Sequence, residues 1–356
     1  MAFFILLIAG CATAIAQLRE VRHRNTLIRA AIGTAAVLGS GTILLQLLEM
    51  PMVPDVWEKI LVMALSSVLT TLGVSFVVLG ILPSIEKIFD ITTGMTLAEL
   101  RDPKQPLLRQ LQQRAPGTYN HSLQVANVAE AAADAIEADS LLVYVGALYH
   151  DIGKINKPEY FVENQSGGYN RHEKLSPAMS LLVIIGHVKN GIELAREYGL
   201  PRSILHFIES HHGTTLVEYF FHAAKVKAEG ADQAEVNEIE YRYPGPKPRS
   251  KEAAILMLSD AVESATRALT EPNPSRIEAL VRKLSSKRLE DGQFDQCELS
   301  FKELKLIEDA IINRLLAIHH GRISYPSSGG RSGDEAEPRT ASVSVMPPTQ
   351  VKPASA

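Results

Sequence analysis

Histidine and aspartate side chains recur at positions where an apolar helix is expected to place core residues. They are His121, His150, Asp151, His187, His211, His212 and Asp260. A lone histidine on an apolar face is usually a hydrogen-bonded core residue. A buried polar group without a partner costs about 1–3 kcal/mol, so seven independent intrusions of this kind are improbable. One shared metal site would satisfy all of them.

The residue types indicate which metals such a site would take. Imidazole and carboxylate together suit iron, manganese or zinc. Cys11 and Cys297 are far apart and form no CxxC, so we expect neither a disulfide scaffold nor a cysteine zinc site. Seven ligands are too many for one ion but fit two divalent ions if a carboxylate bridges them, because a neutral imidazole has only one free nitrogen. Asp151, beside His150 at the end of "LLVYVGALYHD", is the natural bridge.

The segments that carry these residues have the period of α-helices. Ser176 and Pro177 are typical of a helix start, and Pro201 and Gly213 enclose another helix. No alternating segment is long enough to support a sheet. We therefore predict an all-α helical bundle over residues 117–326. The stretch 327–356 is rich in Ser, Gly, Pro and Thr and is predicted to be a disordered tail.

Three apolar runs precede this bundle: Ala2–Gln17, Ala30–Leu48 and Ile60–Leu82. A helix needs about 20 apolar residues to cross a bilayer, which the second and third runs satisfy. The first run is short, so a tilted span, a truncated span and a signal peptide remain alternatives, although no positive charge precedes it. We predict a membrane domain of about three transmembrane helices over 1–83 and a connector over 84–116.

The distribution of charge predicts how the membrane helices are oriented and which classes of partner are expected. The loop after the first run holds Arg19, Arg22 and Arg24, whereas the next loop has only Lys59, so the basic loop should face the cytoplasm. The bundle then lies in the cytoplasm below a multi-pass inner-membrane domain. The second and third runs contain no Asp or Glu, which favours anchoring in the lipid bilayer over transport. A net charge of -4 argues against a nucleic-acid polymer as partner, and a homo-oligomer stays open.

The motifs resemble a known family. The His-Asp pair of "YHDIGK", an upstream His, and the later "GH", "HHG" and "SDAVE" are similar to the HD-domain metal-dependent phosphohydrolases. The longer stretches "APGTYNHSLQVANVAE", "YPGPKPRSKEAAILMLSDAVE" and "RLEDGQFDQCELS" resemble the seven-transmembrane HD family over residues 84–326. That family includes membrane-bound phosphodiesterases of the PgpH type, which hydrolyse cyclic di-AMP. Its members usually carry an outer domain and six further spans, so we expect a short form, a fragment or a chain truncated at the N-terminus.

The resemblance also implies the ligand sets and the reaction. One ion would be bound by His121, His150, Asp151 and Asp260, and the second by Asp151, His187, His211 and His212. The implied activity is hydrolysis of a cyclic dinucleotide, cyclic di-AMP to linear pApA, by a hydroxide that bridges the two metals, iron or manganese. Alternatives are an HD phosphohydrolase acting on another nucleotide and a membrane receptor that only binds nucleotide; the complete ligand set favours an enzyme.

Four further residues are candidate substrate contacts. Lys154, the second candidate catalytic residue beside Asp151, could hold a phosphate oxygen as a point charge, or be a solvated lysine past a helix end. Tyr119 and Asn120 precede His121 and could line the pocket. His172 lies in a polar stretch, which favours a substrate contact or a surface role over metal binding.

Overall fold

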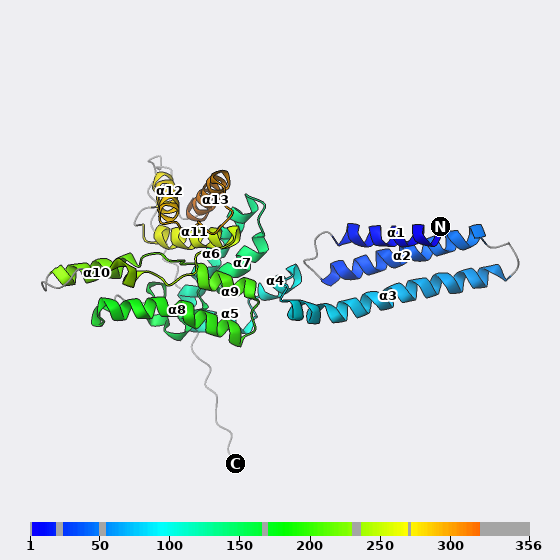
Figure 1. Ribbon diagram of the computed structural model, residues 1–356, viewed down its shortest axis with the longest axis horizontal. Helices are drawn as coiled ribbons and strands as arrows, with labels where there is room; N and C mark the ends of the chain where they lie inside the picture. The colour runs from blue at the N-terminus through cyan, green and yellow to red at the C-terminus, as the bar shows by residue number, and fades with distance from the viewer. Residues whose placement is uncertain are drawn as a thin grey trace, which may run out of the picture.

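The computed structural model describes residues 2–18, 24–49, 55–165, 170–229, 236–269 and 272–320, and over these residues the chain is helical without a named β-strand (Figure 1). The only pairing of extended backbone among them is an isolated bridge between Leu216 and Arg242. The all-α prediction is confirmed for this part of the chain. The tail at 327–356 and most of the basic loop lie outside the described residues.

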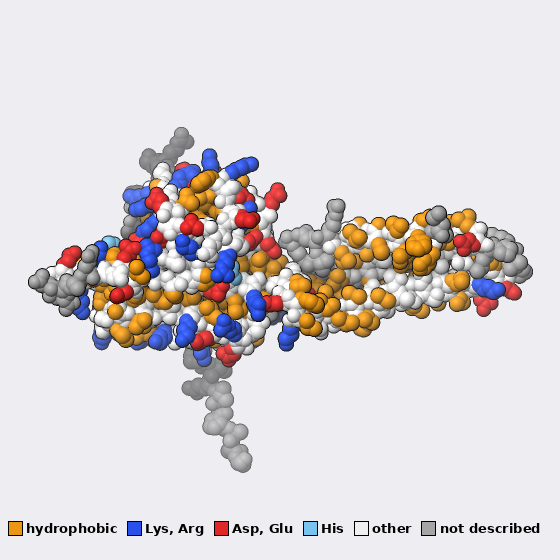
Figure 2. Space-filling view, in the orientation of Figure 1, with side chains coloured by type: hydrophobic (Ala, Val, Ile, Leu, Met, Phe, Trp, Pro, Cys, Tyr) orange, Lys and Arg blue, Asp and Glu red, His pale blue; other side chains and the backbone are white. Residues whose placement is uncertain are grey.

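The first three helices form a slender unit with an apolar surface (Figures 1 and 2). They are α1 (Ala2–Gln17), α2 (Arg24–Glu49) and α3 (Val56–Phe89). Glycines bring them close: a Cβ at Gly39 would lie 2.6 Å from Val68, and one at Gly10 would lie 2.8 Å from Leu38. Large apolar side chains such as Phe76 point outward, as lipid contact requires. By length and composition α2 and α3 can cross a membrane; α1 is a shorter apolar helix, about 24 Å long.

The third helix runs directly into the globular domain. It continues through Pro83 to Phe89 and ends at Asp90, whose φ of 53° is left-handed. Asp90 pairs with Arg202 at 3.0 Å, and the hydroxyls of Thr92 and Ser203 are 2.8 Å apart. The short helix α4 (Gly94–Leu100) follows. These contacts attach the unit formed by α1–α3 to the first turn of α9.

Nine longer helices and several 3₁₀ turns make up the described part of the domain beyond α4. The helices are α5 (Pro106–Arg114), α6 (Pro116–Asp134), α7 (Ser140–Tyr149), α8 (Pro177–Glu197), α9 (Arg202–Ser210), α10 (Glu218–Glu229), α11 (Lys251–Arg267), α12 (Pro274–Glu290) and α13 (Phe301–His320). The turns are η1 (Ile152–Asn156), η2 (Pro158–Tyr160), η3 (Val162–Asn164), η4 (Arg171–Lys174) and η5 (Glu238–Tyr241). The predicted start of α8 is confirmed: the Ser176 hydroxyl accepts from the Met179 amide, and Pro177 opens the helix.

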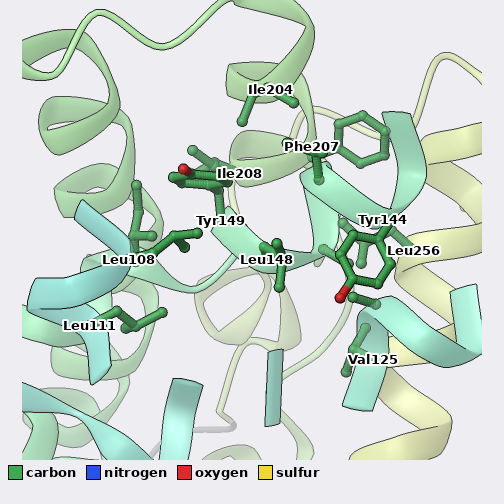
Figure 3. Close-up of a cluster of buried hydrophobic side chains, with 14 of the residues drawn as sticks. Leu108, Leu111, Val125, Tyr144, Leu148, Tyr149, Ile204, Phe207, Ile208 and Leu256 are labelled. Carbon is green, nitrogen blue, oxygen red and sulfur yellow. The ribbon is translucent and has the colours of Figure 1, made fainter. Parts of the chain in front are cut away.

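Helix α7 lies in the centre of this domain, and eight of its ten residues are buried. A helix that is apolar all round belongs in a core. Figure 3 shows Tyr149 and Leu148 of α7 among Phe207 and Ile208 of α9 and Leu108 of α5. Because α7 and α9 pack this tightly, the residues at their C-terminal ends are held in fixed positions.

Helix α8 is also long and apolar enough to cross a membrane by length and composition alone. In the structure it packs against α9, α10 and η1, and it buries Leu181, His187 and Val188. Its apolar character therefore serves the core of the globular domain.

Candidate metal centre

The structure brings all seven predicted ligand residues into one cluster. His121 comes from α6, His150 and Asp151 follow α7, His187 lies on α8, His211 and His212 follow α9, and Asp260 lies on α11. Six of them are buried, and His212 is partly exposed. Two sets of three could each hold a metal ion, with ligand atoms within 4.8 Å of one another. The first is His121, His150 and Asp151; the second is His187, His211 and His212.

Asp151 lies between these sets, and its two oxygens face different histidines. Its Oδ2 is 3.2 Å from His150 Nε2 and 3.6 Å from His121 Nε2. Its Oδ1 is 3.3 Å from His187 Nε2 and 3.6 Å from His211 Nε2. Asp260 faces the first set, with Oδ1 3.0 Å from His121 Nε2. A carboxylate whose two oxygens face different sets of histidines has the geometry that a bridging ligand needs.

Three of the histidines are oriented by carbonyls of their own helices. The Nδ1 of His150 lies 2.7 Å from the Ala147 carbonyl, and that of His211 lies 2.8 Å from the Ile208 carbonyl. His187 repeats the pattern with Ile184 at 2.5 Å. A proton on Nδ1 that is donated to a carbonyl leaves Nε2 with a lone pair in the neutral ring. In the neutral ring, each of these three Nε2 atoms therefore directs its lone pair toward the cluster.

His121 is oriented by a carboxylate. Its Nδ1 lies 2.5 Å from Glu263 Oε2, and Glu263 is buried on α11, one turn after Asp260. A carboxylate that accepts from the outer nitrogen of a ligating histidine fixes its tautomer and raises its basicity. Glu263 was not among the residues singled out from the sequence, although its i+3 spacing from Asp260 places both on one face of the helix.

The side chains of the cluster differ in the direction of their pKa shifts. Burial opposes charge on His150, but Asp151 and Asp260 outweigh it and raise the pKa of His150 to about 10, so a metal bound at Nε2 would have to displace a proton. Burial likewise opposes charge on Asp151, yet Lys154 and His150 hold the pKa of Asp151 well below its usual range. Burial lowers the pKa of His187 to about 3. His187 is therefore neutral near pH 7, with its lone pair available.

Several buried polar atoms of the cluster lack hydrogen-bond partners. Such atoms are expected where a metal ion would bind. His150 Nε2 and Asp151 Oδ1 are buried and make no hydrogen bond. The Nε2 atoms of His187 and His211 face each other at 3.2 Å, although the carbonyls already take the proton of each Nδ1. Lone pairs directed at a common centre are unfavourable unless a cation lies among them. The cluster and its HD-type fold thus indicate divalent metal binding.

Lys154 belongs to the cluster and is not a solvated lysine. Its ammonium lies 2.7 Å from Asp151 Oδ2 and 2.9 Å from Glu163 Oε1, and its side chain is 12% exposed. Glu163 is held in turn by the Thr118 hydroxyl at 2.9 Å. Gly117 permits this contact, because a Cβ there would lie 1.9 Å from the Glu163 carbonyl oxygen. Glu163 and Thr118 were not foreseen, since they lie in a 3₁₀ turn and at a helix start that follow no hydrophobic period.

The predicted substrate contacts are less closely tied to the cluster. Tyr119 is half-buried against the apolar core, and Asn120 is exposed. His172 lies 2.8 Å from the Tyr160 carbonyl through Nε2, and its ring packs on Phe220. Tyr243, by contrast, lies at the cluster and stacks on His212 with centroids 4.3 Å apart. No spacing pattern in the sequence singles out Tyr243.

The fold and the cluster are those of an HD domain, and the family described as "HD domain" matches residues 118–265. Residues 1–93 match the family described as "7TM receptor with intracellular HD hydrolase". The chain belongs to this family of membrane proteins with an HD hydrolase domain. The predicted family resemblance is confirmed.

Among characterised proteins, the chain is similar to cyclic-di-AMP phosphodiesterase PgpH of Bacillus subtilis (strain 168), with 46% identity over 264 residues, 74% of this chain and 36% of the relative. It is also similar to PgpH of Listeria monocytogenes serotype 1/2a (strain 10403S), with 40% identity over 323 residues, 90% of this chain and 44% of the relative. The chain therefore spans less than half the length of these relatives.

A solved structure resembles the globular domain. The crystal structure of the L. monocytogenes phosphodiesterase PgpH HD domain in complex with cyclic-di-AMP has a TM-score of 0.58 and 46% identity, and the match covers 61% of this chain and 99% of that one. At this identity the likeness extends beyond the fold.

Proposed function

We propose that this chain is a metal-dependent phosphodiesterase that hydrolyses a cyclic dinucleotide, specifically cyclic di-AMP to linear pApA. The observation that carries the proposal is the position of Asp151 between the two histidine sets. Its Oδ2 faces His150 and its Oδ1 faces His187. Support also comes from the relatives, which are cyclic-di-AMP phosphodiesterases, and from the related HD domain whose crystal structure contains cyclic di-AMP.

Two divalent ions, iron or manganese, would be held by the seven side chains. The first set is His121, His150, Asp151 and Asp260; the second is Asp151, His187, His211 and His212. Bound ions of this kind supply Lewis-acid polarisation of a phosphoryl oxygen and a nucleophilic water at neutral pH. Because the donors are imidazole nitrogens and carboxylate oxygens without thiolates, the site suits these ions.

The protein's own contribution is orientation, charge and exclusion of water. The carbonyls of Ala147, Ile184 and Ile208 hold three rings with Nε2 toward the centre. Lys154, fixed between Asp151 and Glu163, places a positive charge where a phosphate oxygen would approach. The buried surroundings lower the local dielectric and strengthen each of these interactions.

The membrane arrangement is part of the proposal. We place the HD domain on the cytoplasmic side of the inner membrane, with α1–α3 in the lipid bilayer. Lys87 in the last turn of α3, directly before the domain, agrees with a cytoplasmic end. A homo-oligomer stays a prediction that oligomeric-state measurements of the detergent-solubilised chain would decide.

The test uses the full chain in detergent micelles, loaded with Mn²⁺ or Fe²⁺ and offered cyclic di-AMP, cyclic di-GMP, a mixed cyclic dinucleotide and linear nucleotides. We expect cyclic di-AMP to be converted to pApA. Asp151→Asn should abolish turnover, whereas the matched control Asp295→Asn, an exposed aspartate beside Lys247, should retain it. A metal-loaded chain that turns over none of the cyclic dinucleotides, or an Asp151→Asn variant of wild-type activity, would refute the proposal.

A further inference from the structure

Arg288, near the end of α12, has a side chain without a partner among the described residues. Its Nε is buried and makes no hydrogen bond, and no ion pair to it is formed within the described part of the chain. Arg282, nearly two turns earlier on the same helix, instead pairs with Glu278, Glu308 and Asp309. Burying part of a guanidinium costs free energy unless an acceptor satisfies it, so an acceptor from a bound ligand would stabilise Arg288.

The acidic groups around Arg288 are already engaged elsewhere. Burial lowers the pKa of Arg288, and Asp260, Glu218 and Asp291 are the carboxylates that act against this shift, in that order. Glu218 accepts a hydrogen bond from Lys287. Asp291 is paired with Arg242 at 2.9 Å. The third, Asp260, belongs to the metal cluster. Arg288 therefore has no carboxylate partner of its own among the described residues, and Asp260, a member of the cluster, is the first of the carboxylates whose charge acts on it.

The end of α12 is attached to the segment that carries two of the predicted ligands. The Gln293 side chain is fully buried; its Oε1 accepts from the Thr214 amide at 3.0 Å, and its Nε2 donates to the Thr214 hydroxyl at 2.9 Å. Thr214 follows Gly213, where a Cβ would lie 2.3 Å from Gln293 Oε1. These contacts hold the chain just after His212 against the end of the helix that presents Arg288.

His212 and Asp260 are the two ligand residues whose side chains are most open to solvent. The side chain of His212 is 24% exposed and that of Asp260 is 10% exposed, whereas those of His121, His150 and Asp151 are 2% exposed or less. Among the seven ligand side chains, those of His212 and Asp260 are therefore the ones that a substrate can reach most readily. Asp260 is also the residue whose charge acts most strongly on Arg288.

We propose that Arg288 is a substrate-binding residue whose guanidinium binds an anionic phosphate oxygen of the cyclic dinucleotide at the His212–Asp260 edge of the cluster. A guanidinium suits this role because its planar donors match two phosphate oxygens at once. Arg288 would act together with Lys154, which stands within the cluster as a point charge. The inference rests on the proposed function and adds a residue to it.

The experiment compares the full-length, metal-loaded chain in detergent with Arg288→Gln, Arg288→Lys and the control Arg282→Gln. It measures kcat and KM for cyclic di-AMP, the Kd of inorganic phosphate by calorimetry, and the metal content by mass spectrometry. Loss of a charged hydrogen bond corresponds to about tenfold to hundredfold in binding. We expect Arg288→Gln to raise KM and the phosphate Kd by about tenfold or more with unchanged metal content, Arg288→Lys to give a smaller rise, and Arg282→Gln to match the wild type.

Wild-type KM and phosphate Kd in Arg288→Gln would overturn the inference, as would a parallel loss of metal, which would assign Arg288 to the support of the metal centre. If Arg288→Gln does not fold, Arg288→Lys decides: both constants raised about threefold or more support the inference, and unchanged constants overturn it. A wild-type chain that turns over no cyclic dinucleotide refutes the proposed function alone, because the phosphate titration still tests Arg288.

Discussion

Replacing Glu263 by glutamine tests the orientation of His121. The Glu263 carboxylate lies 2.5 Å from His121 Nδ1, and both side chains are almost fully buried. Burial opposes charge on His121, and hydrogen bonds with Asp260 and Glu263 raise the pKa of His121. Glutamine has nearly the same volume and can still accept through its amide oxygen, but it removes the negative charge that makes His121 a stronger donor to a metal.

The size of the effect follows from this contact. A buried hydrogen bond to a charged group contributes about 1.5–3 kcal/mol, and 1.4 kcal/mol is a factor of ten in an equilibrium constant. We therefore expect Glu263→Gln to lower the binding affinity for one of the two ions by about tenfold to hundredfold, as for other residues that hydrogen-bond to ligating histidines. The ion held by His187, His211 and His212 should be little affected, because none of these residues contacts Glu263.

The assay dialyses the full chain against graded chelator concentrations and counts the retained metal by mass spectrometry. For Glu263→Gln, one ion should leave at about tenfold to hundredfold lower chelator concentration than in the wild type. Glu278→Gln is the matched control, since Glu278 is exposed on α12 and pairs only with Arg282 among the described residues. If Glu263→Gln retains both ions with wild-type affinity, the orienting role of Glu263 is wrong.

Further predictions concern packing, metal removal and pH. Gly153→Ala places a Cβ 1.8 Å from the His187 carbonyl oxygen and should destabilise the domain by about 2 kcal/mol or more in urea unfolding. Phe207→Ala, at a fully buried ring, should cost about 3–5 kcal/mol in the same assay. Chelation should lower the Tm measured by scanning calorimetry, since ions at a hundred times Kd add about 2.7 kcal/mol. Hydrogen bonds from Lys251 and Ser300 lower the pKa of Glu303 to about 2. The contribution of Glu303 to stability is thus present above about pH 4.5 and lost as the pH falls toward 2, and the urea-unfolding difference between wild type and Lys251→Met should shrink over that window.

The sequence was most informative where local rules and burial agreed. The start of α8 at Ser176 and Pro177 follows from capping chemistry, and the end of α7 at His150 follows from the apolar run that stops there. The membrane helices follow from composition, because lipid admits few alternatives. The predicted domain limits at residues 83, 116 and 326 remain predictions.

The sequence was least informative about residues that act through a neighbour. Glu163 reaches Lys154 from a 3₁₀ turn, and Tyr243 reaches His212 from an irregular segment; neither belongs to a periodic pattern. Arg288 resembles any other cation on an exposed helix until the contacts of its neighbours are known. Such positions depend on tertiary packing, which the period of a single helix does not record.

The position of the histidines explains why so short a motif as His-Asp at a helix end is informative. His150 and His211 are the C-cap residues of α7 and α9, where the last carbonyls have no partner within the helix. Each ring satisfies one of these carbonyls through Nδ1 and thereby presents Nε2 outward. The same helix ends carry partial negative charge, which favours a cation close by. Stopping an apolar helix at a histidine therefore fixes the tautomer, directs the lone pair and provides a field suited to a metal in one step. The adjacent aspartate supplies the charge that two histidine sets can share.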